Sequence, residues 1–206
     1  MAQILKLTLH ERMLSAAEQV FAEAGYSGAT MASIAQRAGI STGNIYRYFD
    51  NKEALFSAIL PDAFAHAFRR LLKRRLAGLV EALDVTELGP KARMQADELL
   101  HFWITNRRKV VIILDRAEGS RFADFGAEFV KDLLRATRTK LHKQHRVRRL
   151  SGPEELVLTN IFQSTRRSIV SILESFDDEA QIRAAVAAFW RYQLAGLAGF
   201  TKGVIS

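Results

Sequence analysis

The spacing of the apolar residues constrains the fold of this chain most strongly. Apolar side chains recur at intervals of three and four residues along all 206 residues, which is the period of an amphipathic α-helix. Alternating β-branched runs are absent, and the one dense patch, Val110 to Leu114, continues a helical pattern. Prolines occur at only three positions, residues 61, 90 and 153. We therefore expect an all-α fold.

Composition narrows the class of protein. Hydrophobic residues make up 49% of the sequence and charged residues 25%, as in an ordinary globular protein. The absence of cysteine excludes disulfides and thiolate metal sites. No stretch approaches the roughly 18 consecutive apolar residues of a membrane span, and the N-terminus lacks the pattern of a signal peptide. We expect a soluble, cytoplasmic protein without a membrane segment.

The charge of the chain favours a polyanionic partner but does not locate its site. The net charge is +8 and the pI is about 10. Residues 1–52 hold five basic and four acidic residues, a net of only +1, whereas Lys131–Arg149 holds eight basic residues and one acid. This basic run is either a solvated helix face, the commoner case, or a contact for DNA flanks, an acidic partner or an anionic effector.

Three short helices are predicted near the N-terminus: Thr8–Ala24, Thr30–Ala38 and Ser41–Tyr48. Gly25 supplies a stop for the first, and Gly39 can adopt the left-handed backbone of a sharp turn. Asp50 and Glu53 are predicted to cap a fourth helix. The residues expected to form the shared core are Leu14, Ala17, Phe21, Ile34, Ala35, Ile40, Ile45 and Phe49.

The segment from Thr30 to Phe49 has the layout of a helix-turn-helix. The small side chain of Ala35 lets two helices approach closely, and a helix starting at Ser41 would present its first residues to the major groove of DNA. The face expected to be exposed consists of Thr42, Gly43, Asn44, Arg47 and Tyr48. Asparagine can read adenine and arginine can read guanine, while threonine, tyrosine and helix N-termini suit phosphate.

Residues 12–60 resemble the DNA-binding domain of the TetR family of transcriptional regulators. The matching positions are Leu14, Ala17, Phe21, Gly25, Thr30, Ile34, Ala35, Ala38, Gly39, Ser41, Gly43, Tyr46, Phe49, Lys52 and Leu55. The resemblance implies phosphate contacts by Thr30 and Lys52, backbone contacts by Tyr46 and Tyr48, and base-edge contacts by Ser41, Thr42, Gly43 and Asn44. Arg47 occupies a variable recognition position in the family.

Several of these residues have a plainer alternative. Thr30 and Ser41 could cap helices, and could do so while also contacting DNA. Tyr46 could be a core aromatic and Lys52 a solvated charge. Residues 1–52 are the predicted DNA-binding domain and residues 53–206 a helical ligand-binding and dimerisation domain. The helices expected beyond residue 60 are Asp62–Ala82, Lys91–Asn106, Arg107–Ala117, Phe122–Arg146, Pro153–Ser175 and Asp177–Ala198.

The last helix is apolar on nearly every face, with Arg183 and Arg191 on one narrow arc. Such a helix must be covered from both sides. The core of the domain can cover one side and a second subunit the other, so residues 153–198 are the predicted homodimer interface, and the family resemblance implies the same. The alternative is a buried core helix in a monomer.

The family resemblance also implies an effector pocket among the middle helices, although an aromatic stripe is more often plain core. The residues predicted to line it are Phe102, Trp103, Asn106, Phe125, Phe129, Phe162 and Gln163. Together these features predict a sequence-specific regulator, most often a repressor in this family, that leaves a palindromic double-stranded operator when an unidentified small molecule binds. The alternative is a DNA-binding or protein-interaction member without small-molecule control.

An enzyme is the remaining class, and the sequence offers little for it. There is no glycine-rich phosphate loop, no H-E-x-x-H motif and no cysteine nucleophile. His142 and His145 lie three residues apart on a predicted helix, but no acid lies nearby to complete a metal site. We expect no catalytic activity, no metal and no cofactor.

Overall fold

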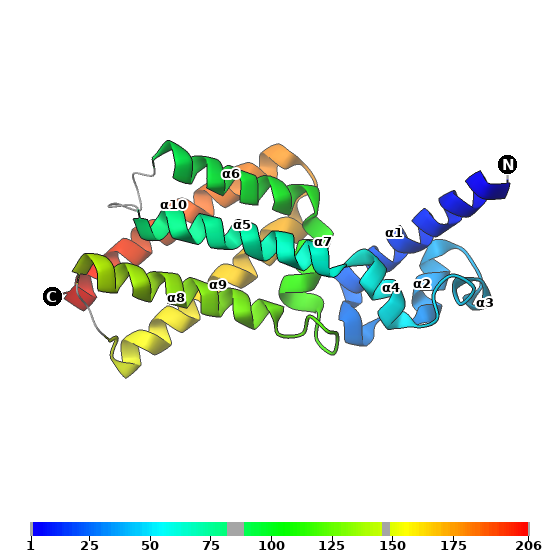
Figure 1. The fold of residues 1–206 in the computed structure, drawn as a ribbon, viewed down its shortest axis with the longest axis horizontal. Helices are drawn as coiled ribbons and strands as arrows, with labels where there is room; N and C mark the ends of the chain where they lie inside the picture. The colour runs from blue at the N-terminus through cyan, green and yellow to red at the C-terminus, as the bar shows by residue number, and fades with distance from the viewer. Residues whose placement is uncertain (1, 82–88, 146–148, 206) are drawn as a thin grey trace. The chain divides into compact units, whose positions relative to one another are not determined.

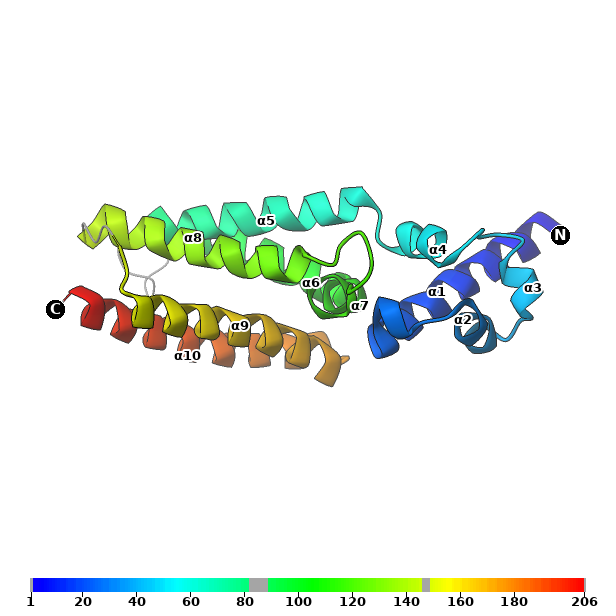
Figure 2. The same cartoon turned by 90° about the horizontal axis from the view of Figure 1, so that it is seen from below.

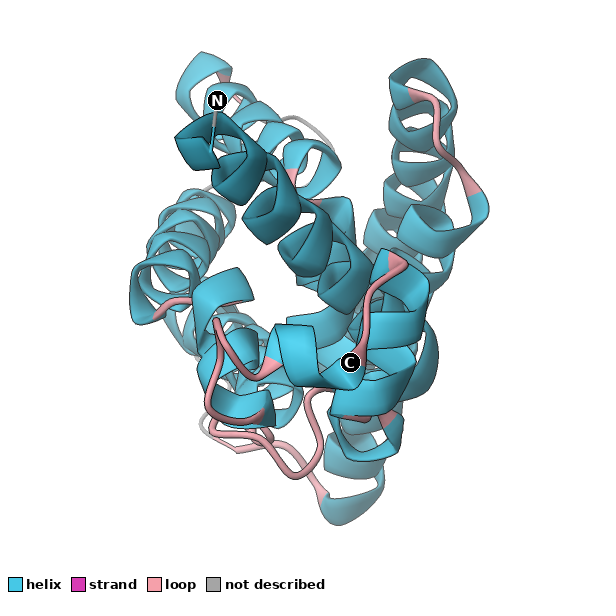
Figure 3. Cartoon of the chain, turned by 90° about the vertical axis from the view of Figure 1, so that its right-hand side faces the viewer, coloured by secondary structure: helices cyan, strands magenta, loops and turns pink. Residues whose placement is uncertain are grey.

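The computed structural model describes residues 2–81, 89–145 and 149–205 (Figure 1). Its elements are α1 (Ala2–Gly28), α2 (Met31–Ala38), α3 (Thr42–Ile45), α4 (Lys52–Ile59), α5 (Asp62–Glu81), α6 (Pro90–Thr105), α7 (Arg107–Val111), the π-helical turn η1 (Ile112–Arg116), α8 (Phe125–His145), α9 (Gly152–Ser175) and α10 (Glu179–Ile205). In these ranges every regular element is helical, which confirms the all-α prediction (Figure 3). None of their helices is long and apolar enough to cross a membrane.

The chain divides into two compact units. Unit 1 comprises Met1–His66 and Arg108–Phe125, and unit 2 comprises Ala67–Arg107 and Gly126–Ser206. The predicted division at residue 52 differs, because α4 and the segment around η1 pack with α1. The assignment of residues 1–52 to DNA binding and of residues 53–206 to ligand binding and dimerisation stays a prediction.

Local side-chain bonds set the ends of the short helices of unit 1. Gly25 leaves the helical conformation (φ 71°), and one further turn of α1 follows it. Thr30 caps α2: its hydroxyl accepts from the Ser33 amide at 3.0 Å, and the Ser33 hydroxyl accepts from the Thr30 amide at 3.1 Å. The predicted left-handed Gly39 is confirmed, with φ 66°.

The predicted Asp50 cap of the fourth helix is wrong. Asn51 is the N-cap of α4, and its Oδ1 accepts from the Ala54 amide at 2.8 Å. Glu53 is engaged elsewhere, accepting from the Tyr26 hydroxyl at 2.9 Å. The third helix is also shorter than predicted, because only Thr42–Ile45 are regular and a series of turns carries the chain on to Phe49.

Aromatic packing holds unit 1 together. The Phe56 ring meets the Phe21 ring edge-on at 5.1 Å between centroids, and Phe122 lies 6.4 Å from Phe56. Six of the eight predicted core residues are buried: Ala17, Phe21, Ile34, Ala35, Ile45 and Phe49. Leu14 and Ile40 are only half-buried, because the neighbouring Met13 takes the inward position on α1 and Ile40 lies in the open turn.

Unit 2 is a bundle of long helices. Figure 2 shows α9 and α10 running side by side, and a buried hydrogen bond joins them, from Gln193 Nε2 to Thr165 Oγ1 at 2.9 Å. Helix α8 begins at Phe125 rather than at the predicted Phe122, because the Ser120 side chain bonds to neighbouring backbone and holds a turn there. The predicted helix ends at Ala82 and Arg146 lie outside the described residues.

Candidate functional site

A tight turn between α2 and α3 fixes the recognition segment, residues 39–49. The Ile40 amide donates to the Ala35 carbonyl at 3.0 Å and the Gly39 amide to the Gln36 carbonyl at 3.1 Å. Both bonds satisfy carbonyls at the end of α2 while the left-handed glycine reverses the chain. The Arg12 guanidinium, from α1, donates to the Ala38 carbonyl at 2.7 Å and locks this turn from the side.

Two buried apolar side chains hold α3 in place, and its polar residues face outward. Ile45 and Phe49 are buried. The residues on the outer side are Ser41, Thr42, Gly43 and Arg47, which are exposed, and Asn44, which is half-buried. The Ser41 hydroxyl accepts from the Asn44 amide at 3.3 Å, so this serine caps α3 as its alternative role requires. The segment therefore presents short hydrogen-bonding groups on a rigid support.

Gly43 leaves open space on this outer face. A Cβ atom at Gly43 would meet no other atom within 4 Å, so the fold itself does not require a glycine there. A glycine at an unobstructed position suits the close approach of a partner's backbone.

The two tyrosines of the segment lie in different surroundings. Half of the Tyr46 side chain is exposed, at 50%, which excludes the alternative of a core aromatic. The Tyr48 ring is half-buried and lies 6.3 Å from the His10 ring, while His10 also stacks on Phe49 at 5.4 Å. Tyr46 is the more accessible of the two to an external partner.

Lys52 has a structural role that its sequence position does not reveal. Its ammonium donates to the Tyr26 carbonyl at 2.6 Å and to the Ala29 carbonyl at 3.0 Å, and it lies 4.3 Å from the centroid of the Tyr26 ring. These bonds tie the start of α4 to the end of α1. A lysine has three N–H donors, so a phosphate contact by Lys52 would use the one that remains.

Glu53 and Arg121 continue this network beneath the recognition segment. Burial, and then the hydrogen bond to Glu53, raise the pKa of Tyr26 to about 12. Arg121 lies 3.8 Å from the Glu53 carboxylate and donates to the Leu60 carbonyl at 2.9 Å. Arg121 thus links both ends of α4 to the segment that precedes α8.

Arg37 is a cation near the recognition segment that the sequence analysis left out. Its guanidinium binds Glu23 in a bidentate pair, with N–O distances of 2.8 and 2.6 Å. This hydrogen bond lowers the pKa of Glu23. Because Glu23 offsets its charge, Arg37 adds less positive potential to this face than Arg47, which is exposed.

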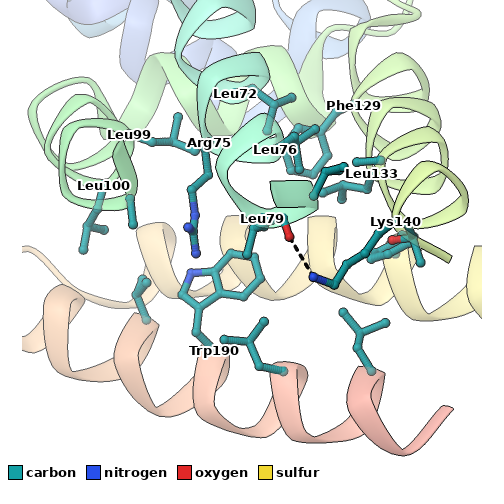
Figure 4. A pocket seen from close by; sticks show the side chains of 18 of the residues that line it. Leu72, Arg75, Leu76, Leu79, Leu99, Leu100, Phe129, Leu133, Lys140 and Trp190 are labelled. Atoms are coloured by element: carbon teal, nitrogen blue, oxygen red, sulfur yellow. Dashed lines mark hydrogen bonds between the residues drawn. The ribbon is translucent and has the colours of Figure 1, made fainter. Parts of the chain in front are cut away.

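Unit 2 encloses a cavity of about 570 Å³ (Figure 4). Its walls are mostly leucine and aromatic side chains from α5, α6, α8, α9 and α10. Three of the predicted pocket residues line it, namely Trp103, Phe129 and Phe162. The predicted residues thus include lining from α6, α8 and α9 but none from α5 and α10. That this cavity is an effector pocket stays a prediction.

The other four predicted pocket residues do not line this cavity: Phe102, Asn106, Phe125 and Gln163. Phe102 turns to the Phe68 ring, 5.7 Å away, and Asn106 donates to the Phe102 carbonyl at the end of its own helix. Phe125 belongs to unit 1, and Gln163 is half-buried outside the cavity. Charged residues at the cavity, which the sequence analysis missed, are Arg75, Arg93, Asp97, Lys140 and Lys202.

The exposed residues of α9 and α10 include large apolar side chains. The large side chains there are Leu156, Val157 and Tyr192, which are 62%, 47% and 77% exposed. Exposed small residues, including Ala184, Ala188 and Ala195, accompany Tyr192 along α10. The opposite side of α10 contributes Ile182 and Val186 to the core of unit 2. The helix that the sequence predicts to be covered on both sides is covered on one within this chain.

Among residues 2–81, 89–145 and 149–205, no group of three or more histidine, aspartate or glutamate side chains has the arrangement of a metal site.

Comparison with known proteins shows what the N-terminal part of the chain is similar to. Residues 13–59 match the family of bacterial regulatory proteins described as the tetR family. The HTH-type transcriptional repressor DhaR of Mycobacterium sp. is 25% identical over 190 residues, covering 80% of this chain and 96% of DhaR. The HTH-type transcriptional regulator BetI of Paraburkholderia phymatum is 34% identical over 128 residues, covering 55% of this chain and 63% of BetI.

Among solved structures, a TetR-family transcriptional regulator from Pectobacterium atrosepticum aligns over 93% of this chain and 94% of that chain, with 22% identity and a TM-score of 0.44. That score is too low to carry an argument about function. The match of residues 13–59 and the alignments with DhaR and BetI confirm the predicted resemblance to the TetR family. Residues 13–59 of this chain match the DNA-binding part of the tetR family of bacterial regulatory proteins, and the chain is similar over most of its length to the transcriptional repressor DhaR.

Proposed function

We propose that this protein is a homodimeric repressor that binds a palindromic DNA operator through residues 39–49 and leaves it when a small molecule occupies the cavity of unit 2. The observation that carries the proposal is the outward-facing row of short polar groups on α3, held by the buried Ile45 and Phe49. A rigid support for polar groups is what reading base edges in the major groove requires.

The roles of the individual residues follow from chemistry and position. Thr42, Gly43 and Asn44 stand at the start of α3 and approach base edges, with Ser41 beside them. Arg47 is exposed and long enough to reach a guanine. Thr30, Tyr46 and Tyr48 contact the sugar–phosphate backbone, and Lys52 offers a phosphate its third donor.

Dimerisation through residues 153–198 is supported by the apolar outer side of α9 and α10. Large exposed apolar surface rimmed by polar residues marks protein interaction sites. A second copy of the same face covers it with two-fold symmetry, which is the commonest arrangement of soluble oligomers. Two symmetric recognition segments then require two symmetric half-sites, and hence a palindromic operator.

Control by a small molecule is supported by the cavity. Its volume lies within the roughly 300–1,000 Å³ of sites for drug-sized ligands. The chain crosses between the two units at residues 66/67, 107/108 and 125/126, so these three crossings are the covalent routes from the cavity to the recognition segment. A coupling of roughly 5- to 150-fold in DNA affinity is usual for such a switch.

We also propose that this protein is cytoplasmic and has no catalytic activity. DhaR and BetI are named as regulators, and a regulator acts where the DNA is.

Selection of bound sequences from random duplex DNA tests the proposal. We expect an enriched motif with two inverted half-sites at a fixed spacing. The Asn44→Ala variant, selected in parallel, should lose one position of the motif in each half-site and keep the spacing. An enriched motif without inverted symmetry would contradict the dimer, and the lack of any enriched motif would contradict sequence-specific binding.

A further inference from the structure

The charges at the cavity of unit 2 are mostly positive. Its lining includes four basic residues, Arg75, Arg93, Lys140 and Lys202, and one acid, Asp97. Asp97 already pairs with Arg183, at 2.7 Å between Oδ1 and Nη1. Among the described residues the lining thus carries four basic side chains, and its acid is already paired with an arginine outside the cavity.

Arg75 is one of two half-buried cations at this cavity, with Lys140. Arg75 lies on α5, and its guanidinium extends toward the indole of Trp190 on α10 (Figure 4). Its partner within the described ranges is the Ala92 carbonyl, which accepts from Nη1 at a long 3.3 Å. Burial lowers the pKa of Arg75, and no carboxylate contributes to that shift.

A half-buried guanidinium without an anionic partner is less well compensated than an exposed one. A buried charge is normally paired or fully hydrogen-bonded, because removal from water costs several kcal/mol otherwise. One carbonyl satisfies one of the five N–H donors of an arginine. The remaining donors are suited to an acceptor that enters the cavity, and a carboxylate or phosphate can bind two of them at once.

Lys140, on α8, also lines the cavity. Its ammonium donates to the Leu79 carbonyl at 3.0 Å, drawn as the dashed line in Figure 4. It therefore adds positive potential while remaining tied to the end of α5. The rest of the wall is mostly apolar, with Leu76, Leu133 and Trp190 among the side chains that surround the space.

We infer that the effector is an amphipathic anion, whose charged head binds Arg75 and whose apolar body fills the leucine- and tryptophan-lined space. This inference rests on the proposed function, in which the cavity is the effector site. A cationic ligand would meet like charge, since Asp97 is paired already. A neutral apolar ligand would leave Arg75 half-buried without an anionic partner.

The test compares ligands that differ in the charge of the head group. We would titrate the DNA-free wild-type protein by calorimetry with decanoate, decan-1-ol and decyltrimethylammonium, each below its micellar concentration. Decanoate should bind roughly 10- to 100-fold more tightly than the other two, the value of a hydrogen bond to a charged group. The carboxylates from octanoate to hexadecanoate would be titrated alongside it, so that tail length is covered.

Two variants on the same helix locate the head group. Arg75→Gln should reduce decanoate affinity to that of decan-1-ol and leave decan-1-ol unchanged. Arg70→Gln is the matched control, because Arg70 is exposed on α5 and does not line the cavity, and it should bind decanoate as the wild type does. If Arg75→Gln does not fold, the comparison of head groups on the wild type still decides the ligand class.

The outcomes separate this inference from the proposed function. Equal binding of the three head groups, failure of every carboxylate to bind, or an unchanged decanoate affinity in Arg75→Gln would overturn the amphipathic anion. A carboxylate that binds through Arg75 but does not lower operator affinity, measured by fluorescence anisotropy, would support the ligand class and overturn effector control.

Discussion

The recognition segment of unit 1 and the cavity of unit 2 are built by opposite means. The recognition segment depends on neighbours in sequence: the Gly39 turn, the Ser41 cap and two buried side chains all lie within residues 39–49. The cavity draws its lining from five helices between Leu72 and Lys202. The segment presents its polar groups outward on a rigid support. The side chains that line the cavity, in contrast, belong to the packing that stabilises the helix bundle.

This difference predicts which substitutions change function alone and which change function and stability together. A side chain on the outer face of α3 can change without loss of packing, because solvent surrounds it. A side chain at the cavity wall is also part of the core of unit 2, so its substitution affects stability and ligand binding together. The substitutions below test this difference, from the largest expected effect to the smallest.

The aromatic core of unit 1 should be its most sensitive part. Phe56→Ala removes a fully buried ring that packs on Phe21 at 5.1 Å and on Tyr26 at 4.8 Å. We expect a loss of about 3–5 kcal/mol in the free energy of unfolding, measured in urea. Asn44→Ala is the matched surface change and should alter that free energy by less than about 0.5 kcal/mol. Similar losses of stability in both variants would contradict the expected difference between the buried core and the outer face of α3.

A charge placed on the outer side of α10 should weaken dimerisation. Ala188→Glu places a carboxylate on the exposed face proposed for dimerisation. Burying that charge without a partner should raise the dimer dissociation constant at least roughly 100-fold, as seen by sedimentation velocity. Ala127→Glu, at an exposed position of α8, is the control and should stay dimeric. A wild-type protein that sediments as a monomer at micromolar concentration would rule out this interface.

The same contrast explains what the sequence could predict. The Thr30 and Ser41 caps and the Gly39 turn are predictable, because each depends on residues three or four positions away. The error at Asp50 arose because Asp50 and Asn51 are adjacent capping residues, and only the backbone decides which of them bonds to Ala54. Local chemistry thus predicts the caps of α2 and α3 and the turn between them, whereas α3 ends three residues before the predicted Tyr48.

The residues that line the cavity depend on which face of each helix points inward. The spacing of apolar residues does not predict that face. Phe102 and Trp103 are adjacent aromatics on α6, yet only Trp103 lines the cavity. Arg75 stands in a basic stretch of α5 whose other members, such as Arg70 and Arg74, are solvated. A single cavity-lining arginine in such a stretch becomes visible only when five helices are packed together.

We expect Lys52 both to stabilise unit 1 and to contact DNA. Asn44→Ala should reduce discrimination between operator and mismatched sites by about 1–3 kcal/mol. Lys52→Met should instead weaken all DNA sequences alike and reduce the slope of log affinity against log salt by about one unit. It should also lower stability by about 1–3 kcal/mol, because two carbonyls lose their donor. Anisotropy titrations at several salt concentrations, together with urea unfolding, measure both effects. If Lys52→Met keeps the salt slope and loses stability, Lys52 acts on the fold alone.

Gly43 offers the smallest change in stability and the sharpest test of the comparison. Its Cβ position is open, and alanine is favoured over glycine in a helix by about 0.5–1 kcal/mol. Gly43→Ala should therefore raise the free energy of unfolding slightly, while the added methyl group holds DNA away from α3 and weakens operator binding. Gly119→Ala is the matched control, since Gly119 has φ 81° and an added Cβ would come within 2.8 Å of the Ser27 hydroxyl. That variant should lose stability. Unchanged operator affinity in Gly43→Ala would show that no partner approaches this face closely, and that the glycine serves neither the fold nor the DNA.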